Sequence, residues 1–344
     1  KRNHTIVSKI DKNFIEGEIN SADIAINFSD PFAAVSNISM ALNQSIPVVS
    51  GTTGWLKNYS IIESLSKKNN VGFLYSSNFS IGVNIFFEDI NPNENSKSTV
   101  ILINGFSDSL LHWPEDLVRD LIKNKIRVVK FDNRDCGMSD WSKDSDNPKS
   151  YNLNDMAQDT LSVVNHLGIQ TFHLIGYSMG GMISQILAIN YPEKILSLTC
   201  LMSSGHLFDP ESENPNKNIA REVRRVKLGF SNNKNELKRE LNYHFKLSSL
   251  FTGKGNYALD HESEIIKSIY EITKRKGYNK EAFNQHKRAI KKSGSRYRKL
   301  KKIKTSTLLI HGSNDPFIPI SHSKKMANLI HGCKFEIING AGHD

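Results

Sequence analysis

The sequence around Ser178 has the residue types that a catalytic nucleophile requires. Gly176 and Gly180 flank this serine in a G-x-S-x-G pattern, directly after the apolar run 171–175. In a strand–turn–helix elbow, small residues at these two positions let neighbouring backbone pass close to the serine. The helix expected at 182–190 would direct its N-terminal amides toward a developing oxyanion. The pattern predicts nucleophilic catalysis by Ser178; the alternative is a glycine-rich turn in which the serine only caps the helix.

Length and composition restrict the class of protein that carries this motif. The 344 residues, 38% of them apolar, suffice for one large domain or two smaller ones. No apolar run approaches 18 residues, and no signal-like segment follows the start, so we expect no membrane span. The widely spaced Cys136, Cys200 and Cys333 indicate neither a disulfide framework nor a metal site, which favours a reducing cytoplasm. Because the chain begins with Lys1 instead of Met, we expect its natural N-terminus to lie upstream.

The net charge of +10 is concentrated in one part of the chain. Residues 210–304 contain 25 Lys and Arg against 10 Asp and Glu. Such a block could attract an anionic substrate or membrane surface, but solvated helix faces are the simpler interpretation. We expect no nucleic-acid partner, and the sequence leaves the oligomeric state open.

The N-terminal part of the chain has the alternation of a parallel sheet. An Asp30-Pro31 pair is a helix start, and a Gly-Thr-Thr-Gly turn separates two later elements. The pattern predicts a βαβαβ segment. Its expected elements are a strand at 24–28, a helix to about residue 44, a strand at 47–50, a helix near 61–67 and a strand at 71–75.

Three phrases of this segment, at 23–29, 51–55 and 76–84, resemble dihydrodipicolinate reductase, an NAD(P)H enzyme of lysine biosynthesis. The resemblance covers about residues 1–88. It implies contacts near the nicotinamide end of the cofactor, which would be made by Gly51, Thr53, Asn78 and Phe79.

The segment departs from that family in two respects. The family's first strand and G-x-G-x-x-G phosphate turn would lie ahead of Lys1, and its substrate domain with the catalytic His-His and Lys stretch is not found. We therefore expect a vestigial, incomplete Rossmann-like segment over residues 1–83. NAD(P)H would be bound only if this segment were functional, so tight NADPH binding would identify a working reductase fragment.

The two parts of the chain join near residue 84. The order of an apolar phrase at 84–90, a polar run at 91–97 and an apolar strand at 99–103 predicts a β-hairpin. Both families can account for 84–88, so the chain reads as a reductase segment at 1–83 followed by a second domain at 84–344.

From Thr99 onward the sequence resembles the α/β-hydrolases. Asn104-Gly105-Phe106-Ser107 follows a strand, where that family places its oxyanion loop, usually with His in place of Asn104. The resemblance implies that the backbone amides of Phe106 and Met179 are the two oxyanion donors. The alternative is an ordinary turn at the end of a strand.

The phrase at 132–139 resembles the esterase-like subgroup that includes aclacinomycin methylesterase. We expect Asp132 and Arg134 to brace loops around the site. Cys136 has no paired base in a motif, so we expect it to pack in the interior.

The same resemblance supplies the partners of Ser178. Asp315, in the phrase 311–319, stands where the family carries its triad acid, and His343 lies in the terminal histidine loop after a strand at 334–338. The order Ser, Asp, His is that of the fold. His173 and His311 occupy strand positions and are expected to be structural.

Between about 207 and 300 the pattern changes to charged helical segments, where this family inserts a helical cap over the site. Caps vary freely and set substrate choice. Five apolar or aromatic residues of this region could line the substrate pocket or form the cap's own core: Phe230, Tyr243, Phe245, Leu250 and Phe251.

The sequence thus predicts an α/β protein: an α/β-hydrolase fold with a helical cap, preceded by the Rossmann-like segment. The expected function is hydrolysis of a small-molecule carboxylic ester through an acyl-enzyme, without cofactor or metal. The alternatives are a 4-hydroxy-tetrahydrodipicolinate reductase fragment and a non-functional joined product, since both ends of the chain look cut.

Overall fold

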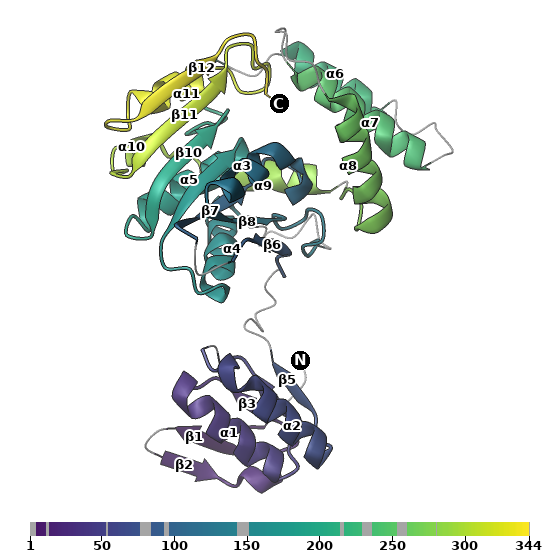
Figure 1. Ribbon diagram of the computed structural model, residues 1–344, viewed down its shortest axis with the longest axis vertical. Coiled ribbons are helices and arrows are strands. Elements are labelled where there is room, and N and C mark those ends of the chain that lie inside the picture. Colours follow the sequence, from purple (N-terminus) through teal and green to yellow (C-terminus); the bar gives the residue numbers. More distant parts are fainter. Residues whose placement is uncertain are drawn as a thin grey trace. The chain divides into compact units, whose positions relative to one another are not determined.

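The chain forms two compact units, residues 1–82 and 83–344, which are described separately (Figure 1). The computed structural model describes residues 5–11, 14–52, 54–75, 84–92, 96–142, 151–213, 217–228, 236–252, 260–279 and 281–343.

The N-terminal unit contains the predicted βαβαβ segment. Its strands form a parallel sheet in the order β3-β4-β5, which confirms the Rossmann-like reading of this segment. Helix α1 begins as the sequence indicates: Pro31 occupies its first turn, and the Asp30 side chain accepts a hydrogen bond from the Phe32 amide. The elements are β3 (Ala25–Asn27), α1 (Pro31–Asn43), β4 (Val48–Ser50), α2 (Tyr59–Asn69) and β5 (Phe73–Tyr75).

One face of this small sheet is covered and the other is not. Ile38 and Leu42 of α1, Ile62 of α2 and Trp55 form a buried cluster with the sheet. On the strands, Ile26 of β3 is 69% exposed. An antiparallel pair that the sequence pattern did not predict, β1 (Ser8–Asp11) and β2 (Phe14–Gly17), precedes the sheet. Short 3₁₀ turns lie at Ile19–Ser21 and Leu56–Asn58.

The larger unit is built on a seven-stranded sheet within the described residues, in the order β12-β11-β10-β9-β7-β8-β6. Neighbouring strands run parallel from β12 to β8, and β6 runs antiparallel to β8. The carboxyl ends of the parallel strands therefore share one edge, where α/β sheets place their ligands. The strands are β6 (Phe87–Ile90), β7 (Ser98–Ile103), β8 (Ile126–Phe131), β9 (Phe172–Tyr177), β10 (Ile195–Leu201), β11 (Ser306–Gly312) and β12 (Lys334–Ile338).

The predicted hairpin between 84–90 and 99–103 is wrong. Strand β7 is paired on one edge with β8 and on the other with β9, so neither edge is left for β6. β6 instead pairs with β8, with Phe87 opposite Phe131. A two-pronged ion pair from Arg127 to Asp89, at 2.8 Å, helps to fix that register.

Helices cover both faces of this sheet, which explains why its central strands are apolar on both sides. In β7, for example, residues 100–103 are all buried. Helix α4 is held at its start by a capping box between Asn152 and Asp155. The covering helices are α3 (Glu115–Lys123), α4 (Leu153–His166), α5 (Met179–Asn190), α9 (Ala282–Ser293), α10 (Tyr297–Leu300) and α11 (Ser321–Ala327), with a 3₁₀ turn η3 at Leu110–His112.

Three further helices, α6 (Lys217–Leu228), α7 (Glu236–Phe251) and α8 (His261–Lys274), lie outside these layers, in the region where a cap is expected (Figure 1). The expected cap extended to about residue 300. Helices α9 and α10 instead contribute Ala289, Ile290, Tyr297 and Leu300 to the hydrophobic core of the sheet.

Among the helices that the structure describes, none is long and apolar enough to cross a bilayer. The same residues contain no group of three or more His, Cys, Asp or Glu side chains placed to hold a metal ion.

Candidate active site

Ser178 occupies a strained turn between β9 and α5. Its backbone angles, φ 52° and ψ −114°, lie in a region that residues with a side chain rarely adopt. The Ser178 amide donates a hydrogen bond to the Leu201 carbonyl of β10 at 2.9 Å, which holds the turn against the sheet. The geometry is that of the predicted elbow, and it places the hydroxyl at the carboxyl edge of the sheet.

The two glycines of the motif are required by close backbone contacts. A Cβ atom at Gly176 would lie 2.4 Å from the Gly180 carbonyl oxygen. A Cβ atom at Gly180 would lie 1.9 Å from the carbonyl oxygen of Ile103 in β7. Backbone atoms cannot yield as a flexible side chain can, so helix α5 can lie this close to β7 only with glycine at 180.

We therefore expect Gly180→Ala to cost roughly 1–3 kcal/mol or more, the range measured for overpacked sites. Chemical denaturation of the larger unit measures this loss. Gly168→Ala is the matched control for packing, since a Cβ atom there meets nothing within 4 Å. Its positive φ of 67° gives Gly168→Ala a backbone cost of its own, so this variant will also lose some stability. A Gly180→Ala variant as stable as the wild type would contradict the packing argument.

The structure brings Ser178, His343 and Asp315 into one hydrogen-bonded chain. The Ser178 hydroxyl lies 3.0 Å from Nε2 of His343, and Nδ1 of His343 lies 2.6 Å from Oδ2 of Asp315. The three residues are 3%, 3% and 8% exposed, so their hydrogen bonds are shielded from bulk water. They follow strands β9, β12 and β11, whose carboxyl ends meet at the same edge of the sheet (Figure 1).

The surroundings of Asp315 keep its carboxyl group ionised. Its Oδ1 atom accepts hydrogen bonds from the amides of Phe317 and Ile318, both at 2.8 Å. Burial on its own would raise the pKa of Asp315, but the His343 and His311 imidazoles outweigh it and hold the pKa below its usual value. An ionised Asp315 only accepts, so Nδ1 of His343 carries the proton of their bond, and Nε2 is left to accept from Ser178.

His311, for which the sequence predicted a structural role, is a neighbour of Asp315. Its Nε2 atom lies 3.1 Å from Oδ2 of Asp315 and 2.8 Å from the Ile318 carbonyl, and its Nδ1 lies 2.7 Å from the Ser323 hydroxyl. The spacing of four residues between His311 and Asp315 was the feature of the sequence that could have predicted this contact. His173, in contrast, is half-buried on β9 and pairs with Ser197 at 2.7 Å.

Phe106 and Met179 occupy the positions expected of oxyanion donors. Met179 is the first residue of α5, where a helix leaves its amides without internal partners. Phe106 lies in the turn after β7, and its amide donates to no acceptor among the described residues. The next amide, of Ser107, is bonded to Nδ1 of His286 at 3.1 Å, which fixes this turn.

Asn104, where the related family usually has His, is fully buried. Its side-chain nitrogen donates to the Phe131 carbonyl of β8 at 3.1 Å, and its own carbonyl accepts from the Asn133 side chain at 3.1 Å. The residue thus ties the turn that carries Phe106 to the end of β8.

The loop after β8 braces this edge of the sheet. Asp132 accepts hydrogen bonds from the amides of Leu110 and Met138 and pairs with Arg275, at the end of α8. Burial raises the pKa of the Asp132 carboxyl despite the opposing effect of the Arg275 guanidinium. Arg134 pairs with both oxygens of Asp159 at 2.7 Å, which ties the loop to α4.

Cys136 in the same loop is buried, and burial raises the pKa of its thiol. A thiol held in its neutral form is a poor nucleophile, so the side chain fits a packing role.

Aromatic rings surround the His343 imidazole. The ring centroids of Phe317, Tyr177 and Phe251 lie 5.1, 5.7 and 6.1 Å from that of His343. Phe251, the last residue of α7, also accepts a hydrogen bond from the His343 amide at 2.7 Å. Of the five residues that could line a pocket, Phe251 is thus placed beside His343, and Phe230 lies outside the described residues.

The remaining described candidates lie on α7. Burial raises the pKa of Tyr243 to about 12, while Phe245 is 37% exposed and Leu250 is half-buried.

Of the four cofactor contacts expected in the N-terminal unit, Gly51 is described. It follows β4, and a Cβ atom there would lie 2.1 Å from the Phe28 ring. Thr53, Asn78 and Phe79 lie outside the described residues.

Comparisons with known proteins identify relatives of each unit. Residues 3–79 match the N-terminal family model of dihydrodipicolinate reductase. The 4-hydroxy-tetrahydrodipicolinate reductase of Christiangramia forsetii is 48% identical over 89 residues, which are 25% of this chain and 37% of that protein. The resemblance of the N-terminal segment is therefore confirmed.

Relatives of the larger unit are hydrolases. Rhodomycin D methylesterase of Streptomyces peucetius is 31% identical over 106 residues, which are 31% of this chain and 35% of that protein. The chain thus spans little more than a third of the length of these two curated relatives. A carboxylesterase structure from Nitrososphaera gargenis superimposes with a TM-score of 0.60 at 19% identity, over 77% of this chain and 89% of that one.

Residues 98–344 match the family model described as the alpha/beta hydrolase fold. This match includes six of the seven described strands of the large sheet, together with Ser178, Asp315 and His343. It spans most of the sequence, and the chain belongs to the alpha/beta hydrolase fold family.

Proposed function

We propose that the larger unit is a serine hydrolase that cleaves a carboxylic ester through an acyl-enzyme. The observation that carries this proposal is the hydrogen-bonded chain Ser178–His343–Asp315, at 3.0 and 2.6 Å. A hydroxyl next to a neutral imidazole, which a carboxylate orients, is the arrangement that activates serine for attack on an acyl carbon.

In the first half of the proposed reaction, Ser178 Oγ attacks the acyl carbon and passes its proton to Nε2 of His343. Asp315 stabilises the resulting imidazolium through the Nδ1 proton. The amides of Phe106 and Met179 donate to the oxyanion, each contributing up to a few kcal/mol in the transition state. His343 then gives its proton to the leaving alkoxide, and an alcohol departs.

In the second half, water attacks the acyl-enzyme and gives a proton to His343. The second tetrahedral intermediate collapses, the carboxylate product leaves, and Ser178 Oγ regains its proton. Every step uses only side chains, backbone amides and water, so the proposed reaction requires no cofactor.

The nucleophile type favours acyl transfer over displacement at a saturated carbon. An acylated serine is an ester, which water can cleave through a tetrahedral intermediate. An alkylated Ser178 would be an ether, which offers no such route and would leave the enzyme blocked. The serine at position 178 therefore supports an ester or a related acyl bond as the substrate.

The substrate class we propose is an ester of a small or medium apolar acid. Phe251, Phe317 and Tyr177 gather around His343, so an acyl or leaving group that reaches Ser178 passes aromatic surface. The name of the methylesterase relative agrees with an ester as the substrate. A series of p-nitrophenyl esters with acyl chains of increasing length tests it: turnover by the wild type supports the proposal, and its absence across the series would refute it.

We expect a variant that lacks residues 1–83 to hydrolyse esters within about twofold of the full chain, because separate compact units commonly fold alone. The larger unit keeps its own contacts at the junction: Asn84 bonds Asp140 at 2.8 Å. Solubility should rise, since the deleted unit exposes Phe32 by 97% and Ile26 by 69%.

Steady-state kinetics of the two purified proteins provide the comparison, and limited proteolysis of the full chain should cleave first in the N-terminal unit. A truncated variant that stays folded by circular dichroism but loses turnover would show that residues 1–83 belong to the active enzyme.

A further inference from the structure

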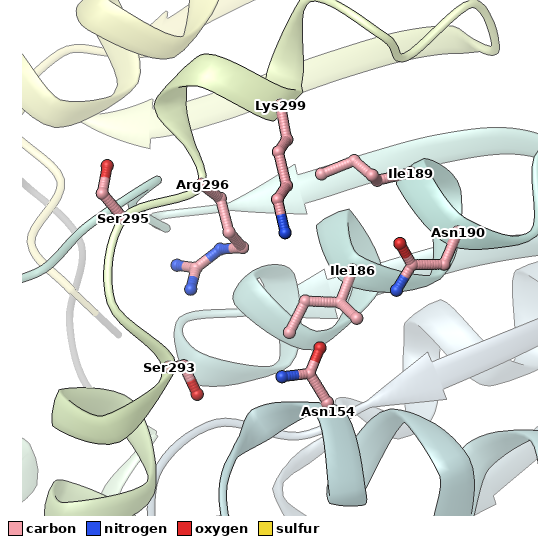
Figure 2. A pocket seen from close by; sticks show the side chains of 8 residues that line it. All are labelled: Asn154, Ile186, Ile189, Asn190, Ser293, Ser295, Arg296 and Lys299. Carbon is pink, nitrogen blue, oxygen red and sulfur yellow. The ribbon is translucent and has the colours of Figure 1, made fainter.

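A small polar cavity lies between helices α4, α5, α9 and α10, and none of the residues that line it belongs to the candidate active site (Figure 2). Its volume is about 50 Å³, room for roughly three or four water molecules at the ~10–15 Å³ that each needs. Two isoleucines of α5 form part of its wall. The polar residues that line it are Asn154, Asn190, Ser293, Ser295, Arg296 and Lys299.

Arg296 is a buried cation that forms no ion pair with a carboxylate in the part of the chain that the structure describes. The residue is 4% exposed. Its Nε donates to the Gln185 side chain at 3.1 Å and its Nη2 to the Ser204 carbonyl at 2.9 Å, both neutral acceptors. Its Nη1 is enclosed and has no hydrogen-bond partner among the described residues. Burial lowers the pKa of Arg296 to about 10, which still leaves the guanidinium charged at neutral pH.

The sequence around Arg296 adds further positive charge and no negative charge. Residues 287–304 contain ten Lys and Arg and no Asp or Glu. Lys299, one helical turn beyond Arg296, lines the same cavity and forms no ion pair with a described carboxylate. Figure 2 shows its ammonium group and the Asn154 amide directed toward the space between the helices.

A buried, unpaired charge is unfavourable unless a counter-charge lies nearby. Here none of the lining residues is acidic: two are cationic, four have amide or hydroxyl side chains that can donate or accept hydrogen bonds, and two are isoleucines. A bound anion would supply the missing negative charge to Arg296 and Lys299 together. Its size must be that of a few oxygen atoms.

We propose that this cavity binds a small dianionic oxyanion, with Lys299 in direct contact and Arg296 supplying the second positive charge from the buried side. Inorganic phosphate is the probe of choice, since it carries up to two charges and fits a space of this size. The bound anion ties α5 to α10 and so stabilises the larger unit.

The test is thermal unfolding and calorimetric titration of the full chain with phosphate, in chloride buffer of constant ionic strength. At about 100 times its dissociation constant, phosphate should raise the unfolding midpoint by roughly 5 °C or more. Acetate at the same ionic strength should give a smaller rise. No response to phosphate, or a larger response to acetate, would overturn the assignment of a dianion site.

Two lysine variants separate this site from the general basic surface. Lys299→Met should weaken phosphate binding by about tenfold or more, the size expected for one charge-assisted contact. Lys301→Met is the matched control: Lys301 is an exposed lysine two residues further on that does not line the cavity. Binding by Lys301→Met should be unchanged, and equal losses in both variants would show that phosphate binds only the diffuse surface charge.

Asn154→Asp supplies a third test that does not depend on removing a cation. The new carboxylate would stand in the cavity as a tethered anion, so the response to phosphate should fall at least tenfold. An Asp in the first turn of α4 also stabilises that helix by itself, so the unfolding midpoint without phosphate will change for a second reason. The quantity to compare is therefore the shift of the midpoint that phosphate causes in each protein. Retention of wild-type phosphate affinity in this variant would refute the proposal.

Discussion

Ser178→Ala should lower ester hydrolysis by roughly 10⁴- to 10⁶-fold, the range found when a triad serine is removed. The expected size follows from the geometry: the Ser178 hydroxyl lies 3.0 Å from Nε2 of His343, so its removal takes away the group that the imidazole would activate. Initial rates with a short-chain p-nitrophenyl ester measure the loss. The residual rate would come from the remaining donors and substrate binding.

The same variant should lose reaction with a fluorophosphonate probe, which phosphonylates activated serines with loss of fluoride. Mass spectrometry of the labelled wild type should place the adduct on Ser178. Ser162→Ala is the control, because Ser162 is exposed on α4 and donates its hydroxyl to the Gln158 carbonyl at 3.0 Å. Labelling that persists in Ser178→Ala would contradict the assignment of the nucleophile.

His343→Ala should abolish turnover as fully as Ser178→Ala, and the double variant should lose no more than either alone. Residues that act as one unit give such non-additive losses. Asp315→Asn should retain roughly 10- to 100-fold more activity than His343→Ala, since the carboxylate only orients and stabilises the imidazole. Single-turnover and steady-state rates of the four variants provide the comparison.

His173→Ala serves as the control for histidine replacement. His173 pairs with Ser197 on the neighbouring strand and is not a member of the hydrogen-bonded series Ser178–His343–Asp315. It should leave turnover close to that of the wild type. Losses that add across Ser178→Ala and His343→Ala would mean that these residues contribute independently, and the proposed mechanism would fail.

The fold of both units was largely predictable because local signals agreed with the global arrangement. The elbow at Ser178 required an apolar strand before it and a helix after it, and β9 and α5 supply them. The Asp30-Pro31 pair fixed the start of α1 in the same way. Where neighbouring residues in the sequence determine the local backbone conformation, the sequence pattern is sufficient to predict the element.

The errors arose where a distant partner decides the outcome. The hairpin at 84–103 was expected from adjacency, yet β8, 23 residues beyond β7, takes the edge that β6 would need. His311 was read as structural because its strand position is visible in the sequence and its contact with Asp315 is not. Pairing of strands and orientation of side chains depend on tertiary packing, which periodicity does not encode.

The cavity beside Arg296 was invisible in the sequence for a different reason. A run of basic residues usually indicates a solvated surface, and most of the ten in 287–304 fit that interpretation: eight are exposed and Arg288 is partly exposed. Only burial distinguishes Arg296 from its neighbours, and burial follows from the packing of α5 against α10.

The hydrogen bond from the His343 amide to the Phe251 carbonyl has a consequence for exchanging parts between related enzymes. It fastens the loop of the proposed base to the last residue of α7, a helix in the region where a cap is expected. A chimera that receives a foreign cap therefore inherits a new acceptor for this amide, or none. The His343 imidazole of such a chimera would then be misplaced even if the new cap binds its own substrate. The exchanged segment must therefore reproduce the carbonyl at the end of α7 as well as the side chains that face the substrate.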